Sequence, residues 1–250
     1  MTELLPSSPP PKSSPAPSRA LYYAHDSPPF SRFANKSSFI PKQPLDVVTL
    51  DLRHQGKNDR HFSEKLFSLS PSLSKTGLLL LSHNQFEKQS ISFLTKNLTN
   101  NNSVKHLILS HCSLPHFAVA ALADLLKVNR FIGWLVLNNS QLDDIATKTL
   151  ALGLRKNKGL SYLVLNDNEI SDEGLLFLLE SLKEHPQLKG FFIHHNPIGQ
   201  SGIKALISFI QSQPQLEKLS ISFTEDIAKN LSEKLLLTAE QHDVDIVVHS

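Results

Sequence analysis

One spacing recurs along most of this chain of 250 residues. Equivalent positions return every 28 residues from Thr76 to Leu216, and the fourth and sixth places of each unit are apolar. These two places hold Leu79/Leu81, Leu107/Leu109, Leu135/Leu137, Leu163/Leu165, Phe191/Ile193 and Leu219/Ile221. Apolar residues two apart predict a short strand with one buried face. A fixed period with one internal pattern predicts a solenoid in which each unit packs on its neighbours.

The second half of each unit predicts a helix. Apolar residues recur at places sixteen, nineteen and twenty-three: Ile91/Leu94/Leu98, Val119/Leu122/Leu126, Leu175/Leu178/Leu182 and Ile203/Leu206/Ile210. Spacings of three and four put these residues on one face of an α-helix. Each unit therefore predicts one strand followed by one helix, so the fold class is α/β with parallel strands.

The unit follows the pattern L-x-x-L-x-L-x-x-N/C-x-L and resembles a leucine-rich repeat. Its full helix is similar to that of the ribonuclease-inhibitor-like subfamily, over about residues 47–250. The resemblance implies a solenoid in a horseshoe arc of about six to seven 28-residue repeats, with strands on the concave face and helices on the convex face. It also implies structural roles, at the asparagine place of the family, for Asn84, Asn168, Asn196 and Cys112.

The chain divides into two regions. Residues 1–44 hold ten of the 15 prolines and many serines, a composition that cannot bury enough apolar surface to offset its ordering entropy. We predict a disordered leader over 1–44 and a leucine-rich repeat domain over 45–250. Apolar residues of the leader, such as Leu21 and Tyr22, are expected to fold over the first repeat as a cap. A helix over 226–241 and a strand over 243–249 are expected to finish the stack.

Charge and cysteine content restrict the partners and the compartment. Lys and Arg total 25 against 23 for Asp and Glu, so no net field favours nucleic acid or an anionic membrane as a partner. Cys112 is the single cysteine, which excludes an internal disulfide framework and fits a reducing compartment. We find no signal peptide and no apolar run of the roughly 18 residues that a spanning helix needs. We therefore expect a soluble, monomeric, cytoplasmic protein.

The sequence carries no motif that predicts catalysis. A phosphate-binding loop, a G-x-S-x-G elbow, an H-E-x-x-H helix and a C-x-x-C pair are all missing from the sequence. His111 and His116 lie near Cys112, but the eighth place faces the inner surface whereas the ninth is buried, which disfavours a thiol–imidazole pair. We expect no enzyme activity and no cofactor.

A row of apolar residues is predicted on the inner face of the sheet. The fifth place of the units holds Leu80, Ile108, Val136, Val164 and Phe192, flanked at the third place by Trp134 and Tyr162. Contiguous exposed apolar surface and exposed aromatic residues are typical of partner sites, so we predict that these residues bind a protein. Two alternatives stay open: the fifth place follows strand propensity alone, or the leader covers the row.

A polar column follows at the eighth place, which holds His54, His83, His111, Asn139, Asp167, His195 and Phe223, with His194 beside it. Imidazoles and a carboxylate can ligate zinc, which takes three or four such ligands at about 2 Å. Because Asn139 interrupts the column, we assign no metal and predict polar contacts to a partner, with binding that depends on pH near about 6 to 7. His242 and His249 are expected to be solvent-exposed.

These features predict a non-enzymatic protein–protein interaction module that binds its partner through the concave strand face. The composition, rich in Asn, Ser and Lys and poor in Gly, also resembles the leucine-rich-repeat effectors that intracellular bacteria deliver into a host cytoplasm. The alternative is regulation of an enzyme, such as activation or inhibition of a GTPase, through Arg53 and the loop from Gln55 to Arg60. A ubiquitin-ligase adaptor is disfavoured because residues 1–46 are too short and too rich in proline for an F-box.

Overall fold

A computed structural model describes residues 21–22, 48–55, 59–224 and 227–249. Strands and helices alternate along the chain, as the repeat predicts. In order they are β1 (Leu21–Tyr22), β2 (Thr49–Asp51), α2 (Asp59–Ser68), the 3₁₀ helix η1 (Ser70–Ser74), β3 (Leu78–Leu80), α3 (Lys88–Thr99), β4 (His106–Ile108), α4 (His116–Val128), β5 (Trp134–Val136), α5 (Asp144–Leu154), β6 (Tyr162–Val164), α6 (Asp172–Leu182), β7 (Gly190–Phe192), α7 (Gln200–Ser212), β8 (Lys218–Ser222), α8 (Lys229–Gln241) and β9 (Asp245–His249).

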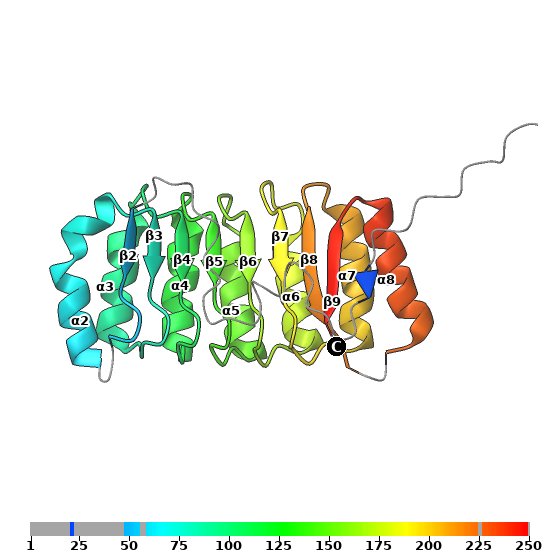
Figure 1. Cartoon of the computed structure of the whole chain (residues 1–250), viewed down its shortest axis with the longest axis horizontal. Helices are drawn as coiled ribbons and strands as arrows, with labels where there is room; N and C mark the ends of the chain where they lie inside the picture. Colours follow the sequence, from blue (N-terminus) through cyan, green and yellow to red (C-terminus); the bar gives the residue numbers. More distant parts are fainter. Residues whose placement is uncertain (1–20, 23–47, 56–58, 225–226, 250) are drawn as a thin grey trace, which may run out of the picture.

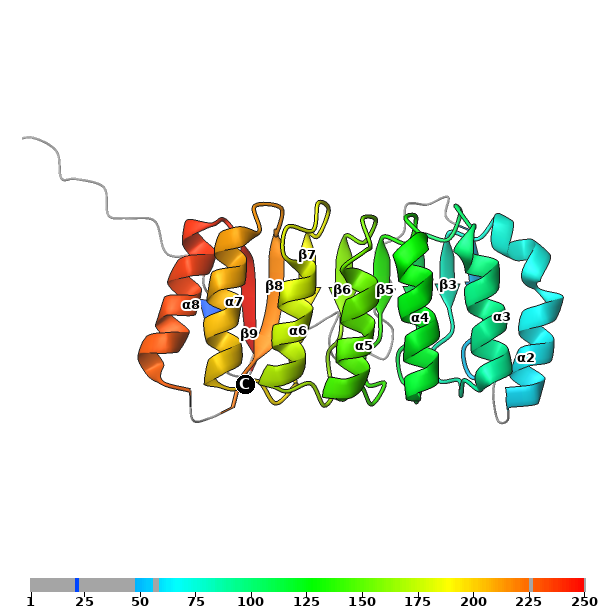
Figure 2. The same cartoon turned by 180° about the vertical axis from the view of Figure 1, so that it is seen from behind.

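The described strands form one parallel sheet, in the order β1-β9-β8-β7-β6-β5-β4-β3-β2. The helices cover one face of this sheet (Figure 1), and the view from behind shows them as a single layer (Figure 2). We call the face without helices the strand face. Leu107 pairs with Leu79 on one side and with Leu135 on the other, which is the register that the 28-residue period predicts. The predicted α/β leucine-rich repeat solenoid is confirmed.

The fourth and sixth places of the units form the main core between sheet and helices. Leu107, Leu135 and Leu163 are buried there, in one cluster with helix residues such as Leu122 and Leu150. Every unit adds the same set of apolar residues to the cluster, so burial in one unit depends on the next. Among the described residues, no helix combines the length and the apolar character that crossing a membrane would require.

The end of the sheet differs from our expectation. β9 pairs with β8 at a spacing of 27 residues, since Asp245 lies opposite Lys218, and β9 also pairs with β1 through Leu21 and Val247. The strand at the end of the chain is therefore not the edge of the sheet. Leu21 and Tyr22 join the last repeat and not the first, so the predicted cap is wrong for these two residues. The rest of the predicted leader lies outside the described residues.

A ladder of side-chain hydrogen bonds holds the turns that follow the strands. Asn84, Asn168 and Asn196 each donate from Nδ2 to a backbone carbonyl of the preceding unit, over 2.7 to 3.0 Å. Cys112 and Ser140 stand at the same place and donate to the equivalent carbonyls from Sγ and Oγ. Burial raises the pKa of the Cys112 thiol to about 12. The predicted structural role of Cys112 is confirmed.

A second ladder, which we did not predict, lies in the turns before the strands. Asn101, Asn129 and Asn157 recur at the 28-residue spacing. Asn157 donates from Nδ2 to two carbonyls of the preceding unit, and its Oδ1 accepts from the backbone N–H groups of Gly159 and Leu160. The sequence signal was present as three asparagines in register, outside the pattern that defines the repeat.

Candidate functional site

The fifth-place row does not form the exposed stripe that we predicted. Leu80, Ile108, Val136 and Val164 expose no more than 4% of their surface, and only Phe192 is half-buried. The four residues form an apolar cluster with Leu78 that is separate from the main core. Their side chains face away from the helices, so the predicted register is right and the predicted exposure is wrong.

Neighbouring side chains of the row contribute to its burial. Each short aliphatic side chain has equivalents on both neighbouring strands at about 4.8 Å, and such neighbours cover one another. The alternative that the leader covers the row concerns residues outside the described part of the chain.

Trp134 and Tyr162 form an accessible aromatic pair on the strand face, where Phe192 of β7 is half-buried as well. They lie opposite each other on β5 and β6, and their rings stack with centroids 3.8 Å apart and an interplanar angle of 17°. Both side chains are half-buried. A Cβ atom at Gly190 would lie 2.4 Å from Cδ1 of Tyr162, so glycine on β7 makes room for the tyrosine ring. Burial raises the pKa of Tyr162, with a further contribution from Glu217.

The eighth-place column owes its residue types to the backbone. Every polar member has a positive φ, from 48° at Asn139 to 61° at His83: His54, His83, His111, Asn139, Asp167 and His195. Asn, Asp and His enter this left-handed region more readily than other residues with a Cβ atom. The column therefore has a conformational cause that is independent of any ligand. Asn139, Asp167 and His195 are exposed, whereas His83 and His111 are half-buried.

Three histidines of this column stack at one end of the sheet. The rings of His54 and His83 lie 4.2 Å apart, those of His83 and His111 4.4 Å apart, and both pairs are nearly parallel. Burial and the neighbouring histidines lower the pKa of His83, so its position in the stack favours its neutral form. Beside it lies a hollow of about 350 Å³, lined by His83, Gln85, His111, Ser113, Asn139 and Gln141.

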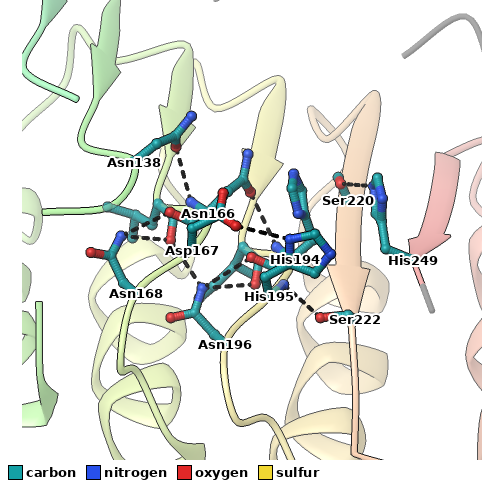
Figure 3. A network of polar contacts seen from close by, with 12 residues as sticks. Asn138, Asn166, Asp167, Asn168, His194, His195, Asn196, Ser220, Ser222 and His249 are labelled. Atoms are coloured by element: carbon teal, nitrogen blue, oxygen red, sulfur yellow. Dashed lines mark hydrogen bonds and ion pairs between the residues drawn. The ribbon is translucent and has the colours of Figure 1, made fainter. Parts of the chain in front are cut away.

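A polar network continues along the other half of the strand face (Figure 3). Asn138 Oδ1 accepts a hydrogen bond from the backbone of Asn166, whose own Oδ1 accepts from the backbone of His194. Asp167 Oδ1 lies 2.9 Å from His195 Nδ1. This contact lowers the pKa of Asp167 and raises that of His195. The network therefore fixes the ends of β5, β6 and β7 relative to one another.

His249 belongs to this network, so the predicted solvation of His249 is wrong. Its ring stacks on that of His194 with centroids 4.1 Å apart, and its Nε2 lies 2.9 Å from Ser220 Oγ. Burial lowers the pKa of His249 and lowers that of His194 to about 3. His242 is exposed, as predicted. The sequence could not indicate this contact, because the two histidines are two strands apart and the last unit has a different length.

Comparison with known proteins supports the fold. No family model and no curated protein matches the chain. Among solved structures it is similar to leiomodin-1 actin-binding site 2, with 16% identity and a TM-score of 0.54, over 63% of this chain and 90% of that one. It is also similar to the tropomodulin C-terminal domain of Caenorhabditis elegans, with 15% identity and a TM-score of 0.53, over 61% of this chain and 92% of that one. The class that fold and site define is a leucine-rich repeat solenoid.

Proposed function

We propose that this chain is a non-enzymatic module that binds a protein partner on the strand face, with Trp134 and Tyr162 at the centre of the contact. The observation that carries the proposal is the stacked, half-exposed pair of rings on a face that no described helix covers. Tryptophan and tyrosine are the residues that most often dominate the free energy of protein association.

The geometry of the pair favours binding. Because the rings stack, each restricts the rotamers of the other. Gly190 has no side chain, so the ring of Tyr162 can occupy the space beside it. Side chains that are ordered before association lose less conformational entropy when the partner arrives. The exposed turn residues Asn139, Asp167 and His195 supply a polar rim, as protein interfaces have around an apolar centre.

The similar structures add support of a general kind. The name of the leiomodin-1 structure states that it contains an actin-binding site. A protein partner for a solenoid of this fold is consistent with that neighbour, and actin is a defined first candidate. The proposal includes the role of a protein-binding scaffold, which the resemblance to ribonuclease-inhibitor-like repeats implies. If the chain is a bacterial effector, as its composition suggests, the partner is a host protein.

The geometry around Arg53 gives no support to a GTPase regulator. Its guanidinium is held by Asp51 through Nε–Oδ1 and Nη2–Oδ2 contacts of 2.9 and 2.6 Å. This pairing lowers the pKa of Asp51 and raises that of Arg53. An arginine that stabilises a transferring phosphoryl group must be free to reach it. Residues 56–58 of the proposed loop lie outside the described part of the chain.

The test is affinity capture with matched variants. The double variant Trp134→Ala/Tyr162→Ala should lose at least tenfold in partner binding, since it removes both central rings. Phe117→Ala/Phe177→Ala removes two exposed rings from α4 and α6 and should bind as the unchanged chain does. Capture from lysate followed by mass spectrometry identifies the partner, and sedimentation with actin filaments tests the defined candidate. Equal capture by both double variants, each folded by circular dichroism, would refute the proposed surface.

A further inference from the structure

We propose that His194, His195 and His249 form a binding site for a divalent metal ion of the zinc class, at the β9 end of the strand face. Each of the three side chains offers a ring nitrogen, and these three atoms lie within 4.8 Å of one another. The site shares His195 with the polar rim of the partner surface proposed above, but its binding of an ion needs no partner protein. It uses no residue of the Trp134–Tyr162 pair.

The three imidazoles converge across an intervening strand (Figure 3). His194 follows β7 and His249 ends β9, while β8 between them contributes Ser220 and Ser222, which are small and buried. The small serines leave space above β8, and the rings of His194 and His249 meet there. The ring of His195 meets that of His194 edge-on with centroids 4.6 Å apart.

One ring nitrogen of His194 is buried and makes no hydrogen bond within the described part of the chain. His194 exposes only 2% of its surface, and the nitrogen concerned is Nδ1. A buried polar nitrogen without a partner costs free energy, so each such atom in a folded protein needs an explanation. A bound cation would accept the lone pair of this nitrogen.

The other two histidines are oriented as metal ligands commonly are. Asp167 holds Nδ1 of His195, and Ser220 holds Nε2 of His249, each over 2.9 Å. A ligating imidazole usually has its second nitrogen tied to a carboxylate or another polar group, which fixes the ring and the tautomer. In both residues the opposite nitrogen is left for an ion.

The chemistry of the donor set favours zinc. Three imidazoles suit Zn²⁺, Co²⁺, Ni²⁺ and Cu²⁺, while Mg²⁺ and Ca²⁺ prefer oxygen ligands. Because a zinc–nitrogen bond is about 2 Å long, ions draw such nitrogens to within about 4 Å of one another. The stacked rings must therefore rotate and close slightly on binding. This closure would link the end of β9 to the turn after β7 and stabilise that end of the sheet.

The test uses the full chain, without a polyhistidine tag and treated with chelator. Calorimetric titration with Zn²⁺ should give one site per chain, and Co²⁺ should give the visible absorption bands of a tetrahedral nitrogen-ligated ion. Zn²⁺ in excess should raise the melting temperature, because a ligand that binds only the folded state stabilises it. Mg²⁺ should do none of these.

Variants locate the ion. His195→Asn keeps a residue type that already occupies the same turn position at Asn139, so it should fold and yet lose at least tenfold in Zn²⁺ affinity. His249→Ala should lose as much, while His242→Ala, which removes an exposed histidine near β9, should bind as the unchanged chain does. The proposal fails if the chain shows no Zn²⁺ binding, or if His195→Asn and His249→Ala bind with unchanged affinity. These readings require no partner protein, so they stand or fall separately from the proposed function.

Discussion

His185 occupies a turn position that asparagine holds in the three preceding units. The asparagines satisfy both a carbonyl of the previous unit and two N–H groups of their own turn, as Asn157 does. His185 has a weaker substitute: Nδ1 accepts from the backbone of Gln187 at 3.4 Å, and Nε2 is buried without a hydrogen-bond partner among the described residues. Burial and the charge of Lys158 lower its pKa to about 4.

This residue should make the stability depend on pH. The folded pKa of His185 is about 4, below the value of about 6.5 for an exposed histidine, so the unfolded chain takes up the proton first as the pH falls. The contribution of neutral His185 to the free energy of unfolding is therefore fully present above about pH 6.5. It is lost as the pH falls from there to about 4, and the loss amounts to up to about 3 kcal/mol. His185→Asn should restore the ladder and remove this loss. Urea unfolding at pH 7 and pH 4.5 measures it, and an equal pH dependence in both proteins would contradict the assignment.

At the scale of elements, adjacent helices approach closely where α5 meets α4. A Cβ atom at Gly153 would lie 2.4 Å from the backbone oxygen of Ala123. Glycine destabilises an α-helix by up to about 1 kcal/mol relative to alanine, so its presence in the last turn of α5 has a packing reason. The 28-residue period predicts that the helices are parallel neighbours, and Gly153 allows the close approach of α5 to α4 at this point.

Gly153→Ala should destabilise the protein although it raises helix propensity. The added methyl group meets backbone atoms that cannot rotate away, and overpacking of this kind costs about 1–3 kcal/mol. Gly133→Ala is the matched control, because a Cβ atom there has its nearest contact at 3.9 Å. Chemical denaturation of both variants measures the difference. Equal midpoints would show that α4 and α5 separate without cost.

At the scale of the whole molecule, the periodic part of the fold could be predicted from the sequence. Leu107 and Leu163 fall in register because every unit repeats the same strand and helix pattern, and the structure pairs each of them with Leu135 as predicted. Cys112 could be placed in the turn ladder for the same reason, whereas Ser140, which departs from the N/C pattern, was placed there by the structure. Repetition constrains the prediction strongly, because a strand or helix placed wrongly in one unit would disagree with the same pattern in the neighbouring units.

The features that could not be predicted depend on contacts beyond that repetition. Val136 is fully buried on a face that the pattern marks as open, because the period indicates which face a side chain is on but not how far that face is covered. The pairing of Leu21 with β9 joins opposite ends of the sequence. His194 and His249 meet across a strand and across a unit of different length. No local periodicity encodes any of these three contacts.

The central claim is that a protein covers the ring pair on the strand face, and Trp134 allows a direct measurement because it is the single tryptophan. Incorporation of 5-fluorotryptophan places one fluorine nucleus at the stacked pair and yields a single ¹⁹F resonance. Addition of the captured partner should shift or broaden this resonance in proportion to complex formation. An unchanged resonance in a fully formed complex would contradict the account.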